Sequence, residues 1–335
     1  MVDTATSPAT PPAAKGFRRF LDFFLVRLII ALVIVGVPAG GLNRLLHMVD
    51  SYLPTAVMEV WRFIRLFLTL LCFHGSYILY VRIFERRKVR EFASSGVLRE
   101  LGLGFAVGFG IIAVTHGFLA IAGVYTIDKF LTPMNLIYFL FMALMSGYTE
   151  ELFLRGIFFR LFEQGLGSWI AIIVSSLVFG FGHLNNPNAT ILSSVFISIE
   201  AGVILAAAFM YTGRLWLPMA IHFAWNFSLG GLFGTPVSGI SRPGMVEGVL
   251  HGPTLLTGGE FGIEASLPAA LFATAVGIVF LVLAYKRGSV VPVPWRRPKV
   301  NSSSVEEQFL EMPQSEPAPG ESIPVDDDSD RLPEG

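Results

Sequence analysis

The chain has 335 residues, of which 53% are hydrophobic and only 15% are charged, and its mean hydropathy is +0.64. This balance excludes an ordinary water-soluble globular protein. The formal net charge of -1 provides no global attraction for a polyanion, so we expect no nucleic-acid partner. The single cysteine, Cys72, excludes an intrachain disulfide and a cysteine metal cluster.

The apolar stretches predict an all-α, polytopic transmembrane helical bundle with about eight spans, surrounded by membrane lipid. A hydrocarbon core needs about 20 helical residues to cross. The stretches that are long enough are 20–43, 61–83, 101–126, 134–160, 168–184, 190–212, 215–233 and 265–286. The first stretch also resembles a signal peptide, but its length and the internal Arg27 favour a retained anchor.

The composition divides the chain into membrane segments and tails. Both ends are rich in Pro, Ser and small or acidic residues without a periodic apolar face, which predicts disorder. The predicted parts are a disordered tail at 1–17, N-terminal transmembrane helices at 18–126, a core at 134–233, a last transmembrane helix at 265–287 and a disordered acidic tail at 288–335.

Basic residues gather at alternate connections between the predicted helices, which predicts the orientation because cytosolic loops retain Lys and Arg. One set comprises Lys15, Arg18, Arg19, Arg82, Arg86, Arg87, Lys88, Arg90, Arg99, Arg160, Arg214, Lys286 and Arg287. The alternate loops carry Arg44, Lys129 and Arg242. We therefore expect a multi-pass protein with both termini in the cytosol. The segment 85–92 could also form a nucleic-acid or lipid patch, but a topology signal is the preferred interpretation.

Ionisable residues inside the predicted spans indicate a functional site. A charge near the bilayer centre costs at least about 2.5–3.5 kcal/mol, so such groups face protein or water. In the fourth stretch, Glu151 and Arg155 are four residues apart and share a helix face, so they can neutralise each other. Glu150 points elsewhere and remains free to act. The competing interpretation is that both glutamates pair with Arg155 to hold helices together.

Two further stretches add polar groups at a four-residue spacing. Phe179 precedes His183 by four residues and can shield its imidazole from water, and the intervening Gly180 and Gly182 permit close helix approach. His222 and Asn226 share a helix face and can present two hydrogen-bond donors to one oxyanion. Buried interhelical hydrogen bonding is the alternative for these groups.

These residues resemble the motifs of the CPBP family of intramembrane proteases, which includes the type II CAAX prenyl endopeptidases. The motifs are matched by Glu150-Glu151-x-x-x-Arg155, Phe179-x-x-x-His183 and His222-x-x-x-Asn226. The resemblance covers about residues 134 to 233 and implies endoproteolysis of a membrane-associated peptide or protein substrate.

The resemblance also implies a role for each catalytic candidate. Glu150, with His183, would activate water as the general base. Glu151 and Arg155 would orient or tune that base, and His222 with Asn226 would stabilise the oxyanion. We expect no required cofactor. The alternative is Zn²⁺ held by Glu150, His183 and His222, because two histidines and a carboxylate match a zinc triad in ligand type.

Two other classes of function compete with the protease. A proton-coupled transporter would use Glu200, in the middle of the sixth stretch, although Glu200 could instead be a counter-ion for Arg155. No repeat with broken helices supports a transporter. A non-enzymatic scaffold or immunity-type protein is the third class, and the complete motifs argue against it. The sequence does not identify the substrate.

Overall fold

A computed structural model describes residues 21–296. The predicted disordered tail at 1–17 and most of the predicted acidic tail at 288–335 lie outside this range, as do Lys15, Arg18 and Arg19.

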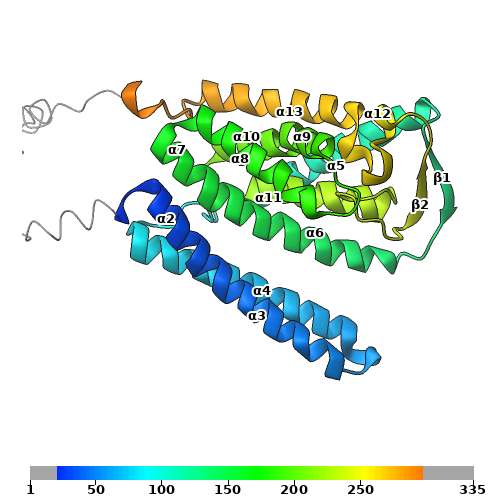
Figure 1. Ribbon diagram of the computed structural model, residues 1–335, viewed down its shortest axis with the longest axis horizontal. Coiled ribbons are helices and arrows are strands. Elements are labelled where there is room, and N and C mark those ends of the chain that lie inside the picture. The colour runs from blue at the N-terminus through cyan, green and yellow to red at the C-terminus, as the bar shows by residue number, and fades with distance from the viewer. Residues whose placement is uncertain (1–20, 297–335) are drawn as a thin grey trace, which may run out of the picture. The chain divides into compact units, whose positions relative to one another are not determined.

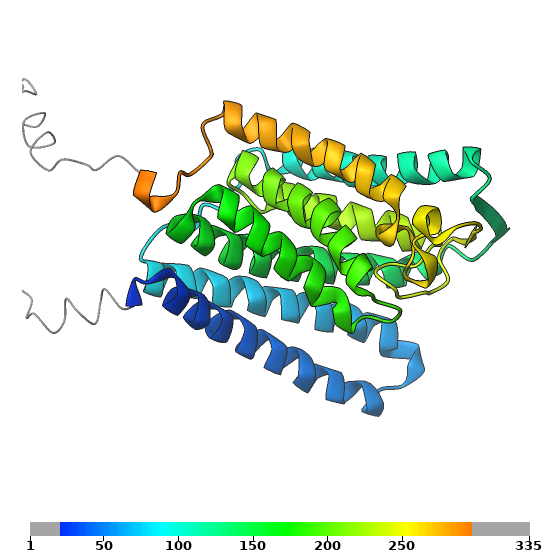
Figure 2. The same cartoon turned by 45° about the horizontal axis from the view of Figure 1, so that its top comes forward.

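Eight helical stretches run up and down along the bundle (Figures 1 and 2). Several continue through a π-helical segment, in which the backbone hydrogen bonds span five residues. In chain order the structure contains α2 (Phe24–Ala31), π-helical Leu32–Gly36 and α3 (Val37–Met48); α4 (Met58–Tyr80) with π-helical Val81–Glu85; α5 (Val97–Ile121); α6 (Asn135–Glu151), π-helical Leu152–Phe159 and α7 (Arg160–Leu166); α8 (Ser168–Gly182); α9 (Ile191–Ile197), π-helical Ser198–Gly202 and α10 (Val203–Thr212); α11 (Trp216–Asn226) with π-helical Phe227–Leu232; and α13 (Leu267–Lys286).

The prediction of a helical membrane bundle is confirmed. Six helices among the described residues are long and apolar enough to cross a membrane: Phe24–Tyr52, Val97–Ile121, Asn135–Leu166, Ser168–Asn185, Ile191–Thr212 and Leu267–Lys286. The stretches predicted at 61–83 and 215–233 are also helical, as α4 and α11, but they are not among these six. α11 and its π-helical continuation hold only 11 and 6 residues, short of the roughly 20 that a hydrocarbon core requires.

The connections at one end contain structure that the apolar pattern did not predict. The stretch predicted at 101–126 ends as a helix at Ile121, and Gly123, with a φ of 71°, turns the chain into a strand. This strand, β1 (Tyr125–Phe130), pairs antiparallel with β2 (Val246–Leu250), with Tyr125 opposite Leu250. This two-stranded sheet holds the long 233–266 connection beside the end of α5.

Short helices complete the connections. α12 spans Thr254–Thr257, and 3-10 turns span Val49–Tyr52, Thr55–Val57, His183–Asn185, Gly259–Phe261, Ile263–Ala265 and Pro294–Arg296.

The apolar core has two buried clusters. One contains Ile112, Phe139, Phe179 and Trp225, and the other contains Tyr77, Leu152, Phe159 and Phe209. The candidate site lies where α6, α8 and α11 meet, and Phe179 of the first cluster contributes to its lining.

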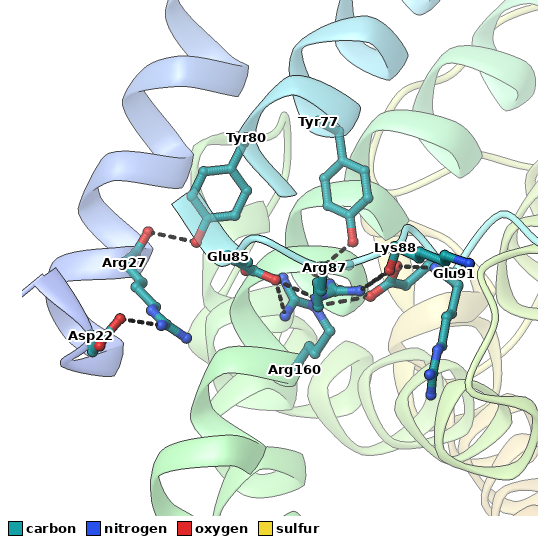
Figure 3. A network of polar contacts seen from close by, with 11 residues as sticks. Asp22, Arg27, Tyr77, Tyr80, Glu85, Arg87, Lys88, Glu91 and Arg160 are labelled. Carbon is teal, nitrogen blue, oxygen red and sulfur yellow. Dashed lines mark hydrogen bonds and ion pairs between the residues drawn. The ribbon is translucent and has the colours of Figure 1, made fainter. Parts of the chain in front are cut away.

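The other end of the bundle carries a buried ion-pair network (Figure 3). Arg160 donates to both carboxylate oxygens of Glu85, at 2.8 and 2.6 Å. Arg87 bridges Glu85 and Glu91, with Nε 2.5 Å from a Glu85 oxygen and Nη2 2.5 Å from a Glu91 oxygen. Tyr77 packs beside them and donates from its hydroxyl to the Gly156 carbonyl at 3.1 Å. The network joins α4 and its following loop to the start of α7.

Candidate active site

The two adjacent glutamates at the end of α6 have different surroundings. The side chain of Glu151 is fully buried, whereas that of Glu150 is 36% exposed and lines a cavity. Successive helical residues diverge by about 100°, which accounts for the difference. The helix becomes π-helical at Leu152, immediately after the pair. π-Helical segments often occur at functional sites, because they shift side chains and free backbone groups.

Arg155 compensates the buried charge of Glu151. Its Nη1 donates to Oε1 of Glu151 at 2.9 Å, and its Nη2 donates to the carbonyl of Gly202 at 3.0 Å. The guanidinium lies 4.8 Å from the centre of the Phe179 ring. Gly202 is the last residue of the π-helical segment that joins α9 to α10. Arg155 thereby links α6 to the α9–α10 helix.

The suggested pairing of Glu200 with Arg155 is wrong. Arg155 makes its ion pair with Glu151, and neither carboxylate oxygen of Glu200 has a hydrogen-bond partner among residues 21–296. Glu200 is fully buried, and Glu264 is the charged group that acts on it electrostatically. The physical reason is local: Glu151 reaches Arg155 within the same helix, and the backbone beside Glu200 supplies the remaining acceptors for the guanidinium.

His222 lies between the two glutamates. Its Nδ1 donates to Oε1 of Glu151 at 2.8 Å, and its Nε2 lies 4.0 Å from Oε2 of Glu150. The ring packs edge-on to Phe179, with 5.8 Å between the ring centres. The bond to Glu151 sets the ring orientation, so that Nε2 faces Glu150.

His183 approaches the same cavity from the end of α8. Its Nδ1 donates to the carbonyl of Phe179 at 2.8 Å, and its Nε2 makes no hydrogen bond within residues 21–296. The centres of the two rings lie 5.0 Å apart, so Phe179 packs against the imidazole. Glu150 makes its ion-pair contact with His222, and the joint action of Glu150 and His183 on a water molecule stays a prediction.

Gly180 allows α8 to approach α9 closely. A Cβ at this position would overlap the Ser198 hydroxyl and the Ser194 carbonyl. Gly182 has open space around it, so the predicted role in close packing applies to Gly180 alone. Gly180 therefore sets the position of the helix end that carries His183.

Asn226 completes the polar lining, one helical turn after His222. Its Nδ2 donates to Oγ of Ser146 at 2.9 Å, and Asn226 itself is almost fully buried. Ser146 was not identified from the sequence, although it precedes Glu150 by four residues and therefore shares its helix face. That spacing was the available signal.

A cavity of about 580 Å³ connects these groups. Its lining includes Glu150, His183, His222, Asn226 and Ser146, with apolar walls from α4, α6 and α8. Beneath the histidines lies a chamber of about 20 Å³, lined in part by His183, His222, Asn226, Ser238 and Glu264. A chamber of this size holds one water molecule.

Glu264 organises the connection above this chamber, and no sequence motif indicated it. It accepts a hydrogen bond from Nε1 of Trp225 at 2.9 Å and others from the backbone N–H and hydroxyl of Ser238. Asn186, three residues after His183, donates to the Ser238 carbonyl at 3.0 Å. Burial raises the pKa of Glu264 above its ordinary value, against the lowering effect of these hydrogen bonds and of His183. The network ties α11, the 233–266 connection and the end of α8 together.

The side chains do not fit a metal ion as they stand. Within residues 21–296, no three His, Cys, Asp or Glu side chains are grouped so that they could hold one. Both ring nitrogens of His222 already face carboxylates. The set of Glu150, His183 and His222 therefore does not form a zinc triad in this arrangement. Independence from a cofactor remains a prediction.

Comparison with known proteins supplies independent information on identity. Residues 132–228 match the family model described as Type II CAAX prenyl endopeptidase Rce1-like. Neither the curated proteins nor the solved structures gave a match. The family match confirms the resemblance recognised in the three motifs, all of which lie within the matched residues. It supports, in general terms, a CAAX-type intramembrane endopeptidase with a peptide or protein substrate in a lipid environment. The chain is an integral membrane protein in which residues 132–228 match the Rce1-like model of type II CAAX prenyl endopeptidases.

Proposed function

We propose that the protein hydrolyses a peptide bond within the membrane by means of water activated by Glu150. The observation that carries this proposal is the position of His222 between two acids, with Nδ1 on Glu151 and Nε2 facing Glu150 at 4.0 Å. One acid is buried and neutralised by Arg155, and the other is open to the cavity. The arrangement separates a structural carboxylate from a reactive one.

The proposed reaction begins with Glu150, which takes a proton from water while the water oxygen attacks the peptide carbonyl carbon. The carbonyl oxygen becomes an oxyanion, which accepts hydrogen bonds from His222 Nε2–H and Asn226 Nδ2–H. Glu150 then gives its proton to the leaving amine as the carbon–nitrogen bond breaks. His183, through its free Nε2, helps to hold the attacking water.

Glu151 and Arg155 act through His222. The oxyanion role requires a proton on Nε2 of His222 while Nδ1 donates to Glu151, so the ring must carry both protons. The buried Glu151 carboxylate at 2.8 Å stabilises that cationic ring. Arg155 balances the second negative charge of the site. These two residues are positioning residues, because Glu151 bonds to His222, Arg155 bonds to Glu151, and neither lines the cavity.

The direct test is cleavage of a quenched fluorescent peptide library by the purified protein in lipid nanodiscs, with a farnesylated CAAX peptide as a separate probe. Glu150→Gln and His222→Ala should each lower turnover by about 10² to 10⁴-fold, the usual contribution of a general acid–base group. The control is Glu247→Gln, since Glu247 is an exposed residue of β2 paired with Lys129. Full turnover in the Glu150→Gln protein would contradict the proposal.

Metal dependence is tested in the same assay. We expect turnover to persist in a strong chelator, because the site residues are already paired with one another. Loss of turnover in chelator, followed by recovery with Zn²⁺, would overturn the metal-free mechanism.

A scaffold function makes a different prediction in cells. If the protein acted only through binding, Glu150→Ala would keep the full biological effect. The transporter interpretation depended on Glu200, which lines neither the site cavity nor the chamber below it. Substrate flux across liposome membranes would support the transporter interpretation if the wild-type protein showed it and Glu200→Gln abolished it.

A further inference from the structure

The basic residues gather at one end of the bundle. This end holds the loops between α4 and α5, between α7 and α8, and between α10 and α11, together with the end of α13 (Figure 1). Its cations are Arg82, Arg86, Arg87, Lys88, Arg90, Arg99, Arg160, Arg214, Lys286 and Arg287. The opposite end holds Arg44, Arg62, Arg65, Lys129 and Arg242. Arg62 and Arg65 are paired there with Glu59 and Asp50, both at 2.6 Å.

The basic end is closed by buried groups. The Glu85 and Arg160 side chains are only 2% and 8% exposed, and they pair directly across the end of the bundle (Figure 3). Phe92, from the α4–α5 loop, packs inward against Trp216 and Tyr148, with ring centres 5.3 and 6.1 Å apart. The Glu85–Arg160 ion pair therefore lies between the basic end and the site, because Arg160 follows Glu150 by ten residues toward that end of the same helical stretch.

The site cavity is lined instead by connections from the opposite end. Asn186 comes from the α8–α9 connection, and Val237, Ser238 and Ile240 come from the 233–266 connection. None of the residues that line this cavity comes from the basic-end loops. The path from bulk water to Glu150 therefore starts at the end away from the basic residues.

A second, larger groove leads toward the same cavity. It has a volume of about 730 Å³, and it shares Met142 and Met145 with the site cavity. Its lining combines charged residues of the non-basic end, among them Asp50, Glu59 and Arg242, with the apolar residues Leu66, Ile137, Phe141, Met142 and Met145. A groove lined by both apolar and charged residues suits the end of a membrane-embedded segment where it leaves the lipid.

From these placements we infer that the site opens to the extracytosolic face of the membrane and acts on membrane-anchored polypeptides whose cleaved bond lies in the extracytosolic half. We assign the basic end of the bundle to the cytosolic side of the membrane, because cytosolic loops retain Lys and Arg. The inference about substrates rests on the proposed function, whereas the inference about the opening does not.

The opening is tested by labelling single cysteines in the full chain, in a Cys72→Ser background. The probe is a membrane-impermeant maleimide, applied to intact cells and to inside-out vesicles. Ile240→Cys reports the cavity, the neighbouring exposed Ser241→Cys reports the same end, and the exposed Ser94→Cys reports the basic end. We expect Ile240→Cys and Ser241→Cys to react in intact cells and Ser94→Cys to react only in inside-out vesicles. Reaction of Ser94→Cys in intact cells, or of Ile240→Cys only in inside-out vesicles, would overturn the inference.

The substrate side is tested by comparing protein termini in cells that produce the wild-type chain or its Glu150→Ala variant. We expect the termini that depend on Glu150 to map to the extracytosolic ends of membrane segments. Termini on the cytosolic side would overturn the substrate inference and leave the proposed function standing. Identical sets of termini in the two strains would contradict the proposed function, while the cysteine labelling would still decide the opening.

Discussion

Nδ1 of His222 and Nη1 of Arg155 donate to the same oxygen of Glu151, at 2.8 and 2.9 Å. One buried carboxylate oxygen therefore joins the first and third sequence motifs across two helices. The neighbouring Glu150 takes no part in this bond and stays accessible from the cavity. The two adjacent acids should consequently respond differently to the same substitution.

We expect Glu151→Gln to destabilise the protein and Glu150→Gln to leave its stability nearly unchanged. Glu151→Gln leaves Arg155 buried without a compensating charge, which costs about 3–5 kcal/mol. Glu150→Gln changes a partly exposed group and should shift stability by about 0.5 kcal/mol or less. Thermal unfolding of the purified variants in detergent measures both.

A double variant tests whether the unpaired buried charge of Arg155 causes the loss of stability. Glu151→Gln combined with Arg155→Met removes both buried charges and should recover part of the loss. Equal unfolding temperatures for the Glu150→Gln and Glu151→Gln proteins would refute the assignment of the buried pair.

Gly180→Ala should lower both stability and turnover, while Gly182→Ala should change neither stability nor fold. A methyl group at Gly180 would overlap the Ser194 carbonyl and force α8 away from α9, at a cost of about 1–3 kcal/mol. His183 follows three residues later and would move with the helix end. Unfolding temperature and peptide cleavage, measured side by side, check the prediction; a Gly180→Ala protein as stable as wild type contradicts it.

Glu264→Gln should increase the mobility of the 233–266 connection. A glutamine can still accept from Trp225, but its amide group cannot satisfy both donors of Ser238, and a buried unpaired N–H costs about 1–3 kcal/mol. We expect faster hydrogen exchange in residues 236–240. The matched control is Glu260→Gln, an exposed acid four residues earlier. Unchanged exchange in the Glu264→Gln protein would show that the network does not hold this connection.

The Glu85 network predicts a loss of stability in acid. Burial raises the pKa of Glu85, but the Arg160 and Arg87 guanidiniums outweigh it and hold that pKa below its ordinary value of 4.5. The unfolded chain therefore binds the proton more readily than the folded protein. The stabilisation is present above the unfolded pKa and disappears as the pH falls through the folded pKa.

The test for this network compares wild type with Glu85→Gln across pH. The gap between their unfolding temperatures should be widest near pH 7 and should narrow below about pH 4. Glu59→Gln, which removes an exposed ion pair with Arg62, serves as the control and should have little effect at any pH. A gap that stays constant from pH 7 to pH 3 would contradict the assignment.

The sequence was sufficient for features that depend on spacing within one helix. The bond between Glu151 and Arg155 and the packing of Phe179 on His183 follow from a four-residue interval, which an α-helix brings onto one face. The long apolar stretches likewise predicted the helices, because lipid requires each span to satisfy its own backbone.

Contacts between helices were not predictable in the same way. The bond from His222 to Glu151 depends on the relative rotation of α6 and α11, which single-helix periodicity does not determine. Glu264 lies 39 residues from Trp225 in an irregular connection, where neither a period nor a motif marks it. The π-helical segments also escaped prediction, because their residues are as apolar as those of the α-helices that they extend.

The chamber of about 20 Å³ beneath the histidines has a consequence for the timing of catalysis. A hydrolase surrounded by lipid consumes one solvent molecule in every cycle, and this reservoir stores about one. Under the proposed function, a bound peptide would fill the larger cavity and cut off resupply from outside. Hydration would then have to precede substrate entry, and the stored molecule would limit each closed complex to a single hydrolysis event.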